Sequence, residues 1–504
     1  MLAWTIYISF IGVLVLLLLP RDATRAARWV ALTAAVLGCG LAFAGAIAQA
    51  RQGHVGDVTQ IVKVDWIPAI GATYFLAADG ISLMLVVLTG LAAVAGILFS
   101  WNIEKRTKEF FAFYLALIGG VYGVFLSFDL LLLFVFYELT IIPKYFLIAR
   151  WGSTRREYGA MKLALYSFVG SHLVLIGLIA AWVVARAQTG ETTLNLVKLS
   201  HVAFPAGFQH WVFPLVFVGF AILAGMWPFH TWAPTGHVAA PTAGSMLLAG
   251  VVMKLGAYGC LRVAMVLFPE GVREWQWAIA TLAVIGIIYG AGVALVQRDF
   301  KFVIGYSSVS HMGFVLLGLA TLNTIGLDGA VLQMFSHGII AGLLFGVVGR
   351  MVYERTHTRD LNDLEKMNVG RLLPFAGVTF VIAGVASMGL PGFSGFVAEF
   401  QVLIGAWQTY PVTAILCGMG IVLGVAYTLR AWLKAFYSDV VPVSDPKHGQ
   451  VHVDHPMDPI SFPERAGAVL LIAASLVIGL QPTLLMDWIE PCLKSPMFAR
   501  LLAP

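Results

Sequence analysis

Two acidic side chains lie deep inside apolar segments, Glu138 in VFYELT and Glu399 in FVAEFQV. An ionised carboxylate near the middle of a hydrocarbon layer costs roughly 2.5–3.5 kcal/mol. Burial favours the neutral form of a carboxyl group and a nearby cation favours the charged form, so such a group can exchange protons near neutral pH. We therefore interpret Glu138 and Glu399 as proton-exchanging residues. The alternative is that each acid only tethers neighbouring helices.

Three lysines also belong to apolar segments. Lys254 lies far inside the run SMLLAGVVMKLGAYGCLRV, too deep for its side chain to reach the interface easily, and a buried lysine can trade protons. Lys144 lies near the end of its segment, where we expect its stem to extend and carry the ammonium group to the interface. Lys162 begins the next segment and could be either interfacial or functional.

Four histidines accompany these residues. His230 and His237 flank the proline-containing stretch PFHTWAPTGHVAAP, His311 lies in YSSVSHM, and His337 lies in QMFSHGI. One histidine inside a membrane is often only a hydrogen-bonded core residue. Four of them, together with deep Glu and Lys side chains, predict a chain of titratable sites.

No motif predicts a resident cofactor. The glycines lack the strand, G-x-G-x-x-G and helix context of a nucleotide site. The cysteines lie far apart without C-x-x-C spacing, which gives no iron–sulfur, zinc or disulfide signal; they are Cys39, Cys260, Cys417 and Cys492. We expect no cofactor on this chain and any redox chemistry on other chains.

One histidine-rich segment, HGQVHVDH, could in principle hold a metal ion through His448, His452 and His455. The segment lies in a loop rich in Pro and Asp, and we favour a solvated linker over a metal site. No metal is therefore expected.

The elements that must position these residues are membrane-spanning helices. Of the 504 residues, 60% are apolar and 11% are charged, against about 25% charged residues in a soluble domain. A span needs about 20 apolar residues, and fourteen runs qualify, at 2–20, 28–48, 78–100, 109–127, 129–149, 157–187, 211–232, 239–264, 274–296, 301–320, 324–352, 372–405, 410–438 and 464–486. The fold class is therefore an all-α polytopic membrane protein, and the connections near 49–77, 188–210 and 439–463 are predicted to be loops.

The basic residues predict the orientation. Most Lys and Arg fall in the odd-numbered loops, which by the positive-inside rule face the cytoplasm. The even-numbered loops hold only Arg51, Lys63, Arg186, Lys198, Arg262 and Arg273. We expect both termini on the outer face of a cell membrane. Topology already explains the net charge of +5, so nucleic acid is not an expected partner.

Two spans contain helix-breaking residues. Pro228 and Pro234 are expected to interrupt span seven, and Gly389-Leu390-Pro391-Gly392 to interrupt span twelve. Interrupted helices at corresponding places in two halves indicate an inverted-repeat transporter. Backbone groups at such breaks need protein or water as partners, so we expect water to enter at both breaks.

Long motifs surround these residues: HTWAPTGHVAAPTAGSMLLAGVVMKLGAYG, RDFKFVIGYSSVSHMGFVLLG, LQMFSHGIIAGLLFGVVGRMVYERTHTRDL and MGLPGFSGFVAEF. In these runs the chain resembles the subunit M family of bacterial NADH-quinone oxidoreductases, also called NADH dehydrogenase subunit 4. The resemblance covers essentially the whole chain. It implies an antiporter-like membrane subunit of respiratory complex I, with other membrane subunits of the complex, protons and lipids as partners and with no redox chemistry of its own.

The resemblance also implies a division of the chain. N-terminal helices one to three would occupy 1–108, a first inverted five-helix repeat 109–264, a second repeat 265–440, and a loop with helix fourteen 441–504. In the family, a span-five Glu paired with a span-seven Lys, a span-eight Lys and a span-twelve Glu transfer protons. The motifs place three of these at Glu138, Lys254 and Glu399.

The fourth member is absent. The position expected for the span-seven lysine holds Leu223, and the nearby LPDAH motif reads APTGH, with Thr235 where an acid is expected. One hypothesis is that another base, with Lys162 and His230 as candidates, replaces the missing partner of Glu138 and translocation survives. The other is a scaffold with an impaired half-channel. We favour the first because Lys254, Glu399 and the histidines remain.

Fold and motif do not by themselves fix the complex, because Mrp-type sodium/proton antiporters and membrane-bound hydrogenases contain similar subunits. These remain alternative assignments, and sodium remains an alternative ion. The runs LPGFSGFVAEF and ERTHTRDL favour complex I.

Overall fold

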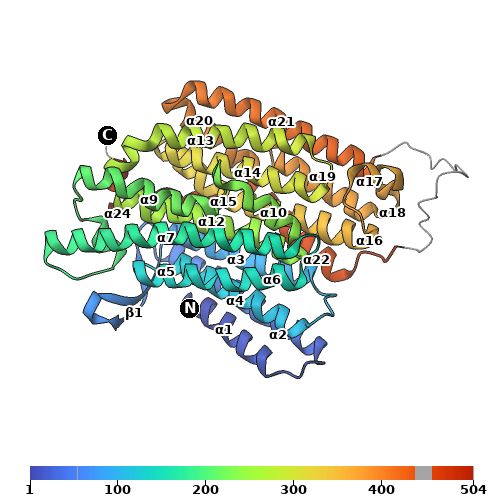
Figure 1. The fold of residues 1–504 in the computed structure, drawn as a ribbon, viewed down its shortest axis with the longest axis horizontal. Helices are drawn as coiled ribbons and strands as arrows, with labels where there is room; N and C mark the ends of the chain where they lie inside the picture. Colours follow the sequence, from blue (N-terminus) through green and yellow to red (C-terminus); the bar gives the residue numbers. More distant parts are fainter. Residues whose placement is uncertain (54, 438–456, 503–504) are drawn as a thin grey trace, which may run out of the picture.

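The structure is a computed structural model that describes residues 1–53, 55–437 and 457–502. Within these residues, twelve helices are long and apolar enough to cross a membrane, and two shorter apolar helices, Ala3–Leu18 and Pro374–Ser387, accompany them. Together they account for the fourteen predicted spans, and the prediction of an all-α polytopic fold is confirmed. The helices run side by side along the long axis of the molecule (Figure 1).

The N-terminal region contributes four helices and a hairpin. The helices are α1 (Ala3–Leu18), α2 (Thr24–Arg51), α3 (Gly80–Phe99) and α4 (Thr107–Leu126). Between α2 and α3, where we predicted a loop, the strands β1 (Thr59–Ile67) and β2 (Ala72–Ala78) pair antiparallel, with Val64 opposite Tyr74. The loop prediction is wrong because this polar segment carries β-branched and aromatic residues. The short helix η1 (Pro68–Ile70) and Gly71, at φ +70°, form its turn.

The first half of the remaining chain combines two long helices, α7 (Arg156–Thr189) and α9 (Ala206–Ala224), with shorter helical segments. The shorter segments are α5 (Leu130–Leu139), α6 (Ile141–Trp151), α8 (Leu196–Ser200), η2 (Phe229–Thr231), α10 (Trp232–Ala239), α11 (Thr242–Leu247), η3 (Leu248–Val252), α12 (Met253–Gly259) and η4 (Cys260–Met265). Asp129 caps α5 by accepting hydrogen bonds from the backbone N–H groups of Leu131 and Leu132, which satisfies donors that the first turn leaves free.

The second half contains the long helices α13 (Pro269–Val296), α14 (Phe300–Ala320), α15 (Thr324–Phe345) and α21 (Pro411–Phe436) together with further helical segments. The further segments are η5 (Gly346–Tyr353), α16 (Glu354–Thr356), α17 (Leu361–Met367), α18 (Val369–Leu372), α19 (Pro374–Ser387) and α20 (Ser394–Thr409), and then α22 (Phe462–Leu480), α23 (Thr483–Leu493) and α24 (Pro496–Leu502). The division into two inverted repeats stays a prediction.

Both predicted helix breaks are present, with one correction. Span twelve is interrupted between α19 and α20, where Gly389 and Gly392 adopt φ values of +75° and +101° that suit glycine. Span seven is interrupted after α9, where Gly225 adopts φ +84°. Pro234, however, lies inside α10 and does not interrupt it, because a proline in the first turn removes a donor that has no helical partner.

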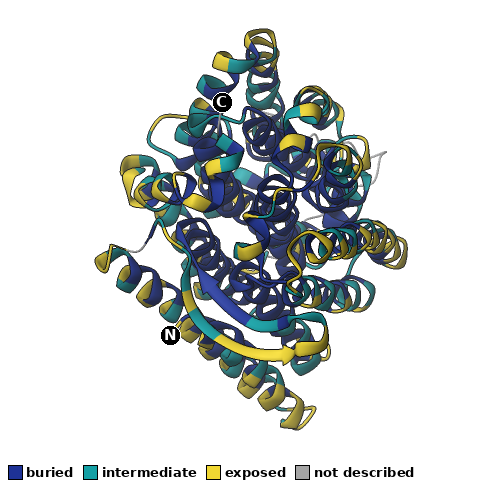
Figure 2. Ribbon diagram, turned by 90° about the vertical axis from the view of Figure 1, so that its left-hand side faces the viewer, coloured by how far each residue is buried: buried dark blue, intermediate teal, exposed yellow. Residues whose placement is uncertain are grey.

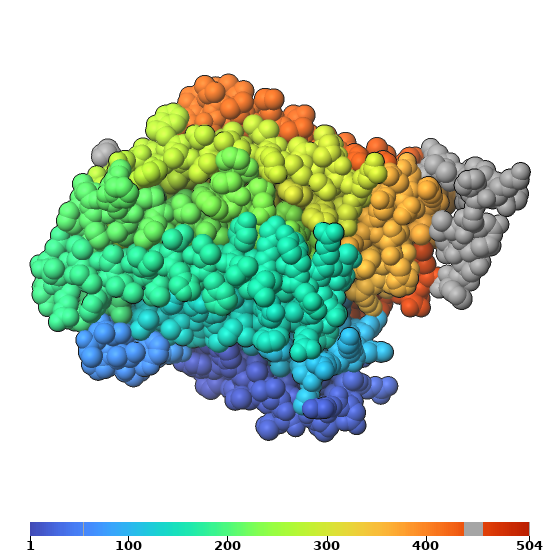
Figure 3. All heavy atoms as spheres, viewed as in Figure 1, coloured from blue at the N-terminus to red at the C-terminus, as the bar shows by residue number. Residues whose placement is uncertain are grey.

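Three spans form the buried centre of the bundle. Viewed from one end, the middle helices are buried and the exposed residues lie around them (Figure 2). The spans Gly80–Phe99, Thr242–Met265 and Thr324–Thr356 are almost entirely buried, whereas α7, α21 and α22 keep exposed faces. In the space-filling view the N-terminal helices form the lower edge of the molecule (Figure 3).

A buried ion pair joins three parts of this core. The Arg262 guanidinium in η4 lies 2.6 Å from the Asp79 carboxylate, which caps α3, and both side chains are at most 1% exposed. The rings of Phe128, Tyr258 and Phe498 lie within 5.4 Å of the guanidinium carbon, so α24 also contributes. Counting Arg262 as a charge of an outer loop was therefore wrong, because its charge is neutralised inside the fold.

Candidate functional site

Lys254 is held at the centre of the bundle. It belongs to α12, a short α-helical segment between the π-helical segments η3 and η4, and π-helical turns are frequent at functional sites. Its side chain is fully buried. The ammonium group donates a hydrogen bond to the carbonyl of Ala249 and lies 2.7 Å from Nδ1 of His337. The structure thus brings together a lysine and a histidine from spans eight and eleven.

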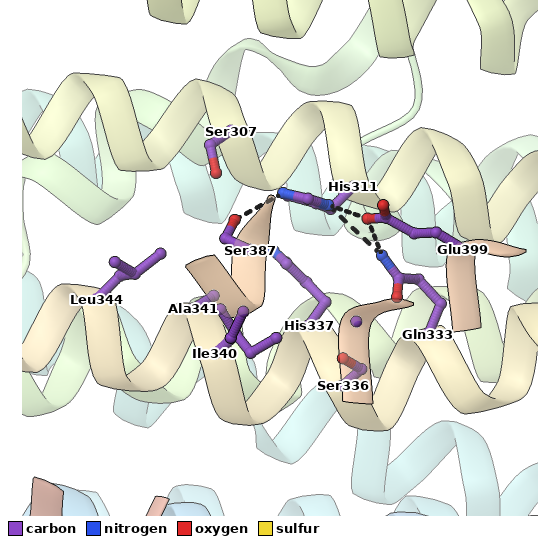
Figure 4. A pocket seen from close by; sticks show the side chains of 12 residues that line it. Ser307, His311, Gln333, Ser336, His337, Ile340, Ala341, Leu344, Ser387 and Glu399 are labelled. Atoms are coloured by element: carbon purple, nitrogen blue, oxygen red, sulfur yellow. Dashed lines mark hydrogen bonds and ion pairs between the residues drawn. The ribbon is translucent and has the colours of Figure 1, made fainter. Parts of the chain in front are cut away.

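His337 leads to a second histidine and to the span-twelve carboxylate. The rings of His337 in α15 and His311 in α14 stack with their centroids 5.6 Å apart. His311 Nδ1 lies 2.8 Å from Oε1 of Glu399 in α20. Figure 4 shows these three side chains converging on one cavity. We name the row Lys254, His337, His311 and Glu399 the central axis.

Polar neighbours fix the orientation of His311 and Glu399. Gln333, one turn before His337 on α15, donates a hydrogen bond of 3.1 Å to Oε1 of Glu399, and the hydroxyl of Ser387 lies 3.0 Å from Nε2 of His311 (Figure 4). Tyr427 reaches the same nitrogen at 3.4 Å. Sequence analysis missed Gln333, Ser387 and Tyr427. Only the spacing of Gln333 and His337, four residues apart on one helical face, could have indicated one of them.

The cavity beside the central axis can accept a water molecule. It offers about 10 Å³ to the centre of a water molecule, close to the ~10–15 Å³ that one requires. Nε2 of His337 is buried without a hydrogen-bond partner, and a water in the cavity would supply one. The span-twelve break lies alongside, since a side chain at Gly389 would place its Cβ 3.4 Å from Oε2 of Glu399.

His237 extends the axis toward the first half. It is fully buried in α10, neither ring nitrogen has a hydrogen-bond partner, and it lies within electrostatic range of Lys254 and Lys301. Trp232 and Phe345 pack against its ring at 6.1 Å and 5.1 Å. His237 can therefore carry a proton only if the side chains or water around it rearrange.

Lys162 and His230 lie together, apart from the central axis. Lys162 donates a hydrogen bond of 3.4 Å to Thr235 and lies within electrostatic range of His230. The ring of His230 packs against that of Tyr289 with centroids 5.2 Å apart, and His230 also interacts with the backbone of Pro228. Among the hydrogen bonds and ion pairs of the described residues, none joins Lys162 or His230 to Glu138.

The charged group that interacts with Glu138 is Lys144. The two residues lie on either side of the junction between α5 and α6. Lys144 is 1% exposed, so the prediction that it reaches the interface is wrong: α6 packs against α4, α7 and α11, which leave its stem no path to the surface. Leu223 is also buried, at 1% exposure.

The structure does not bear on the histidine-rich segment. His448, His452 and His455 lie in 438–456, outside the described residues, so the preference for a solvated linker stays a prediction.

The central axis places buried groups that can accept and donate protons one after another on four helices, α12, α15, α14 and α20. Comparison with known proteins identifies the family of the chain in which this arrangement occurs. Residues 127–424 match the family described as NADH:quinone oxidoreductase/Mrp antiporter, TM. Subunit M of the NADH-quinone oxidoreductase of Rhodobacter capsulatus is 36% identical over 93% of this chain and 90% of its own length. The chain belongs to the NADH-quinone oxidoreductase subunit M family.

Other members of the subunit M family and solved structures agree. Subunit M of Escherichia coli (strain K12) is 34% identical over 97% of this chain and 96% of its own length. A chain of respiratory complex I from Thermus thermophilus superposes with a TM-score of 0.87 at 26% identity over the full length of both chains. A chain of the Mrp complex from Dietzia sp. DQ12-45-1b reaches 0.81 at 22% identity, covering 100% of this chain and 97% of that one, and shares the fold.

Proposed function

We propose that this chain translocates protons as an antiporter-like membrane subunit of a respiratory NADH-quinone oxidoreductase, while other subunits carry out the electron transfer. The central axis is the observation that carries the proposal. Its hydrogen-bonded contacts, Lys254 with His337 at 2.7 Å and His311 with Glu399 at 2.8 Å, are short enough for direct proton transfer.

Each group of the central axis has a defined part in the proposed transfer. The Lys254 ammonium passes a proton to His337, and His337 passes it on to His311 through a water molecule in the cavity. His311 exchanges its proton with the Glu399 carboxylate. Gln333 and Ser387 hold His311 and Glu399 in position. Electron transfer on other subunits would shift the populations of these charge states, as any coupling requires.

Subunit M relatives along the whole chain support membership of complex I more strongly than of an Mrp antiporter. The M subunits of Rhodobacter capsulatus and Escherichia coli are 36% and 34% identical to this chain, whereas the Mrp complex chain is 22% identical and supports the fold alone. The partners proposed are therefore other membrane subunits of the complex, in a bacterial cell membrane. Sodium transport is the alternative, since carboxylates and carbonyls at a helix break can also hold that ion.

The proposed orientation places both termini outside the cell. The first residue and the last described helix, α24, lie toward the same end of the bundle (Figure 1), as an even number of spans requires. Several basic residues meet in a cleft at the end we assign to the cytoplasm, in keeping with the positive-inside rule; they are Lys105, Arg150, Arg156, Lys301 and Arg350.

The substitution Glu399→Gln tests the proposal. It keeps the size of the side chain and its hydrogen bonding but removes the proton-exchanging group, so proton transfer through this chain is expected to fall by about 100-fold or more. The measurement is the number of protons translocated per electron in vesicles that hold the native complex, with quinone reduction recorded in parallel. Glu274→Gln, at an exposed site beside His210, is the matched control. An unchanged ratio in Glu399→Gln would reject the proposal.

A further inference from the structure

We propose that Lys144 is the cationic partner of Glu138, so that the switchable ion pair of the first half is built within one interrupted span, between α5 and α6, instead of between spans five and seven. This inference rests on the proposed proton translocation. It names the residue that lets Glu138 take up and release protons in this chain.

The first support is burial without a partner. The Nζ atom of Lys144 and Oε1 of Glu138 are both buried and have no hydrogen-bond partner. An ammonium group in an apolar interior is strongly disfavoured unless an opposite charge compensates it. Among the described residues, Glu138 is the charge that acts on Lys144, so Glu138 is the group placed to compensate a Lys144 ammonium.

The second support is the geometry of the junction. α5 ends at Leu139 and α6 begins at Ile141, and Pro143 has no N–H group for a hydrogen bond back to Leu139. Side chains of a helix point toward its N-terminus. The long side chain of Lys144 therefore extends back along α6 toward the turn that carries Glu138.

The third support is the apolar character of span seven at this level. Tyr137, next to Glu138, packs against Phe220 of α9 with ring centroids 5.6 Å apart. Leu223, one turn further along α9, is buried and carries no charge. On the face that α9 presents here, a cation for Glu138 is therefore absent among the described residues, while Lys144 supplies one from its own span.

The pair is open in the structure, because no hydrogen bond joins Lys144 Nζ to Glu138 Oε1. A closed pair would stabilise the Glu138 carboxylate beside the Lys144 ammonium. An open pair favours the neutral acid, so Glu138 takes up a proton when the pair opens and releases it when the pair closes. Lys144 acts as a positioning residue for Glu138.

The test measures protons per electron in vesicles that hold the native complex. Lys144→Met removes the charge and keeps the straight side chain, and we expect it to lower the ratio as much as Glu138→Gln does. The double variant should lower it no further, because either change alone abolishes the pair. Lys144→Arg should retain most of the wild-type ratio. Adding Leu223→Lys to Lys144→Met should restore much of it, by supplying the cation from α9.

The matched control is Lys198→Met, at an exposed ion pair with Glu191, which should leave the ratio at the wild-type value. If Lys144→Met matches wild type while Glu399→Gln lowers the ratio, the inference is overturned and the proposed function stands. If neither variant lowers it, the proposed function fails as well. Should the Lys144→Met complex not accumulate, Lys144→Gln is measured with the same criteria, and an additive loss in its double variant with Glu138→Gln would overturn the pairing.

Discussion

Complexes that carry Lys254→Met are expected to lose the whole share of proton translocation that this chain contributes. Lys254 is fully buried and contacts His337 at 2.7 Å. Methionine fills a similar volume but carries no proton, so the central axis would lose its first proton-carrying group and His337 its proton donor. Proton transfer through this chain should fall about 100-fold or more. The measurement is the proton-to-electron ratio of the reconstituted complex, with NADH oxidation recorded alongside.

The control for this prediction is the same substitution at an exposed lysine away from the central axis. Lys494→Met, at an exposed ion pair with Glu490, should leave both the ratio and the rate of NADH oxidation unchanged. A Lys254→Met complex that assembles and translocates protons at the wild-type ratio would show that the contact between Lys254 and His337 does not carry protons.

Asp79→Asn is expected to destabilise the chain by about 3–5 kcal/mol, the cost of leaving one partner of a buried ion pair without the other. Arg262 has an exposed fraction of 0% and lies 2.6 Å from Asp79. Asparagine still accepts a hydrogen bond from the backbone of Ser82, so the cap of α3 survives and the loss reports the ion pair. Thermal denaturation of the purified complex and the amount of chain in the membrane measure this effect.

The matched experiment for Asp79 replaces both partners. In Asp79→Asn with Arg262→Met the unpaired charge is gone, and apolar replacement of a buried pair is often nearly neutral. The double variant should therefore be more stable than Asp79→Asn alone. Equal or greater instability of the double variant would mean that Arg262 contributes mainly through its packing against Tyr258 and Phe498.

The membrane spans were predictable because each is a long apolar run. In a chain with few charges, a run of that length forms a helix that crosses the membrane. The break at Gly389 and Gly392 was predictable for a related reason, since glycine and proline interrupt helices by their own chemistry. Pro234 shows the limit of that reasoning. Its effect depends on where α10 begins, and the start of a helix is set by its neighbours.

The candidate site was predictable residue by residue but not as an arrangement. Depth within a run singled out Lys254 and Glu399, because a charge far from the interface needs a partner. The contacts of Lys254 with His337 and of His311 with Glu399 join spans that are distant in sequence. Such contacts follow from the packing of whole helices and leave no local signal.

The burial of Lys144 was not predicted, for a physical reason. Its place near the end of an apolar run suggested that its side chain would reach the interface, which holds for a helix that faces lipid. α6 instead packs against α4, α7 and α11, and the side chain is enclosed. The hairpin between α2 and α3 was missed because its polar sequence was taken for a loop, although Val62 and Val64 of β1 suit a strand.

The central claim, that this chain carries protons although Leu223 replaces the span-seven lysine, is tested most directly by protons translocated per electron in vesicles that hold the native complex with Glu138→Gln, while quinone reduction is recorded in parallel. The account predicts that electron flow persists and that the ratio falls by the share of this chain. An unchanged ratio with unchanged electron flow would contradict it and would identify the first half of this chain as a scaffold.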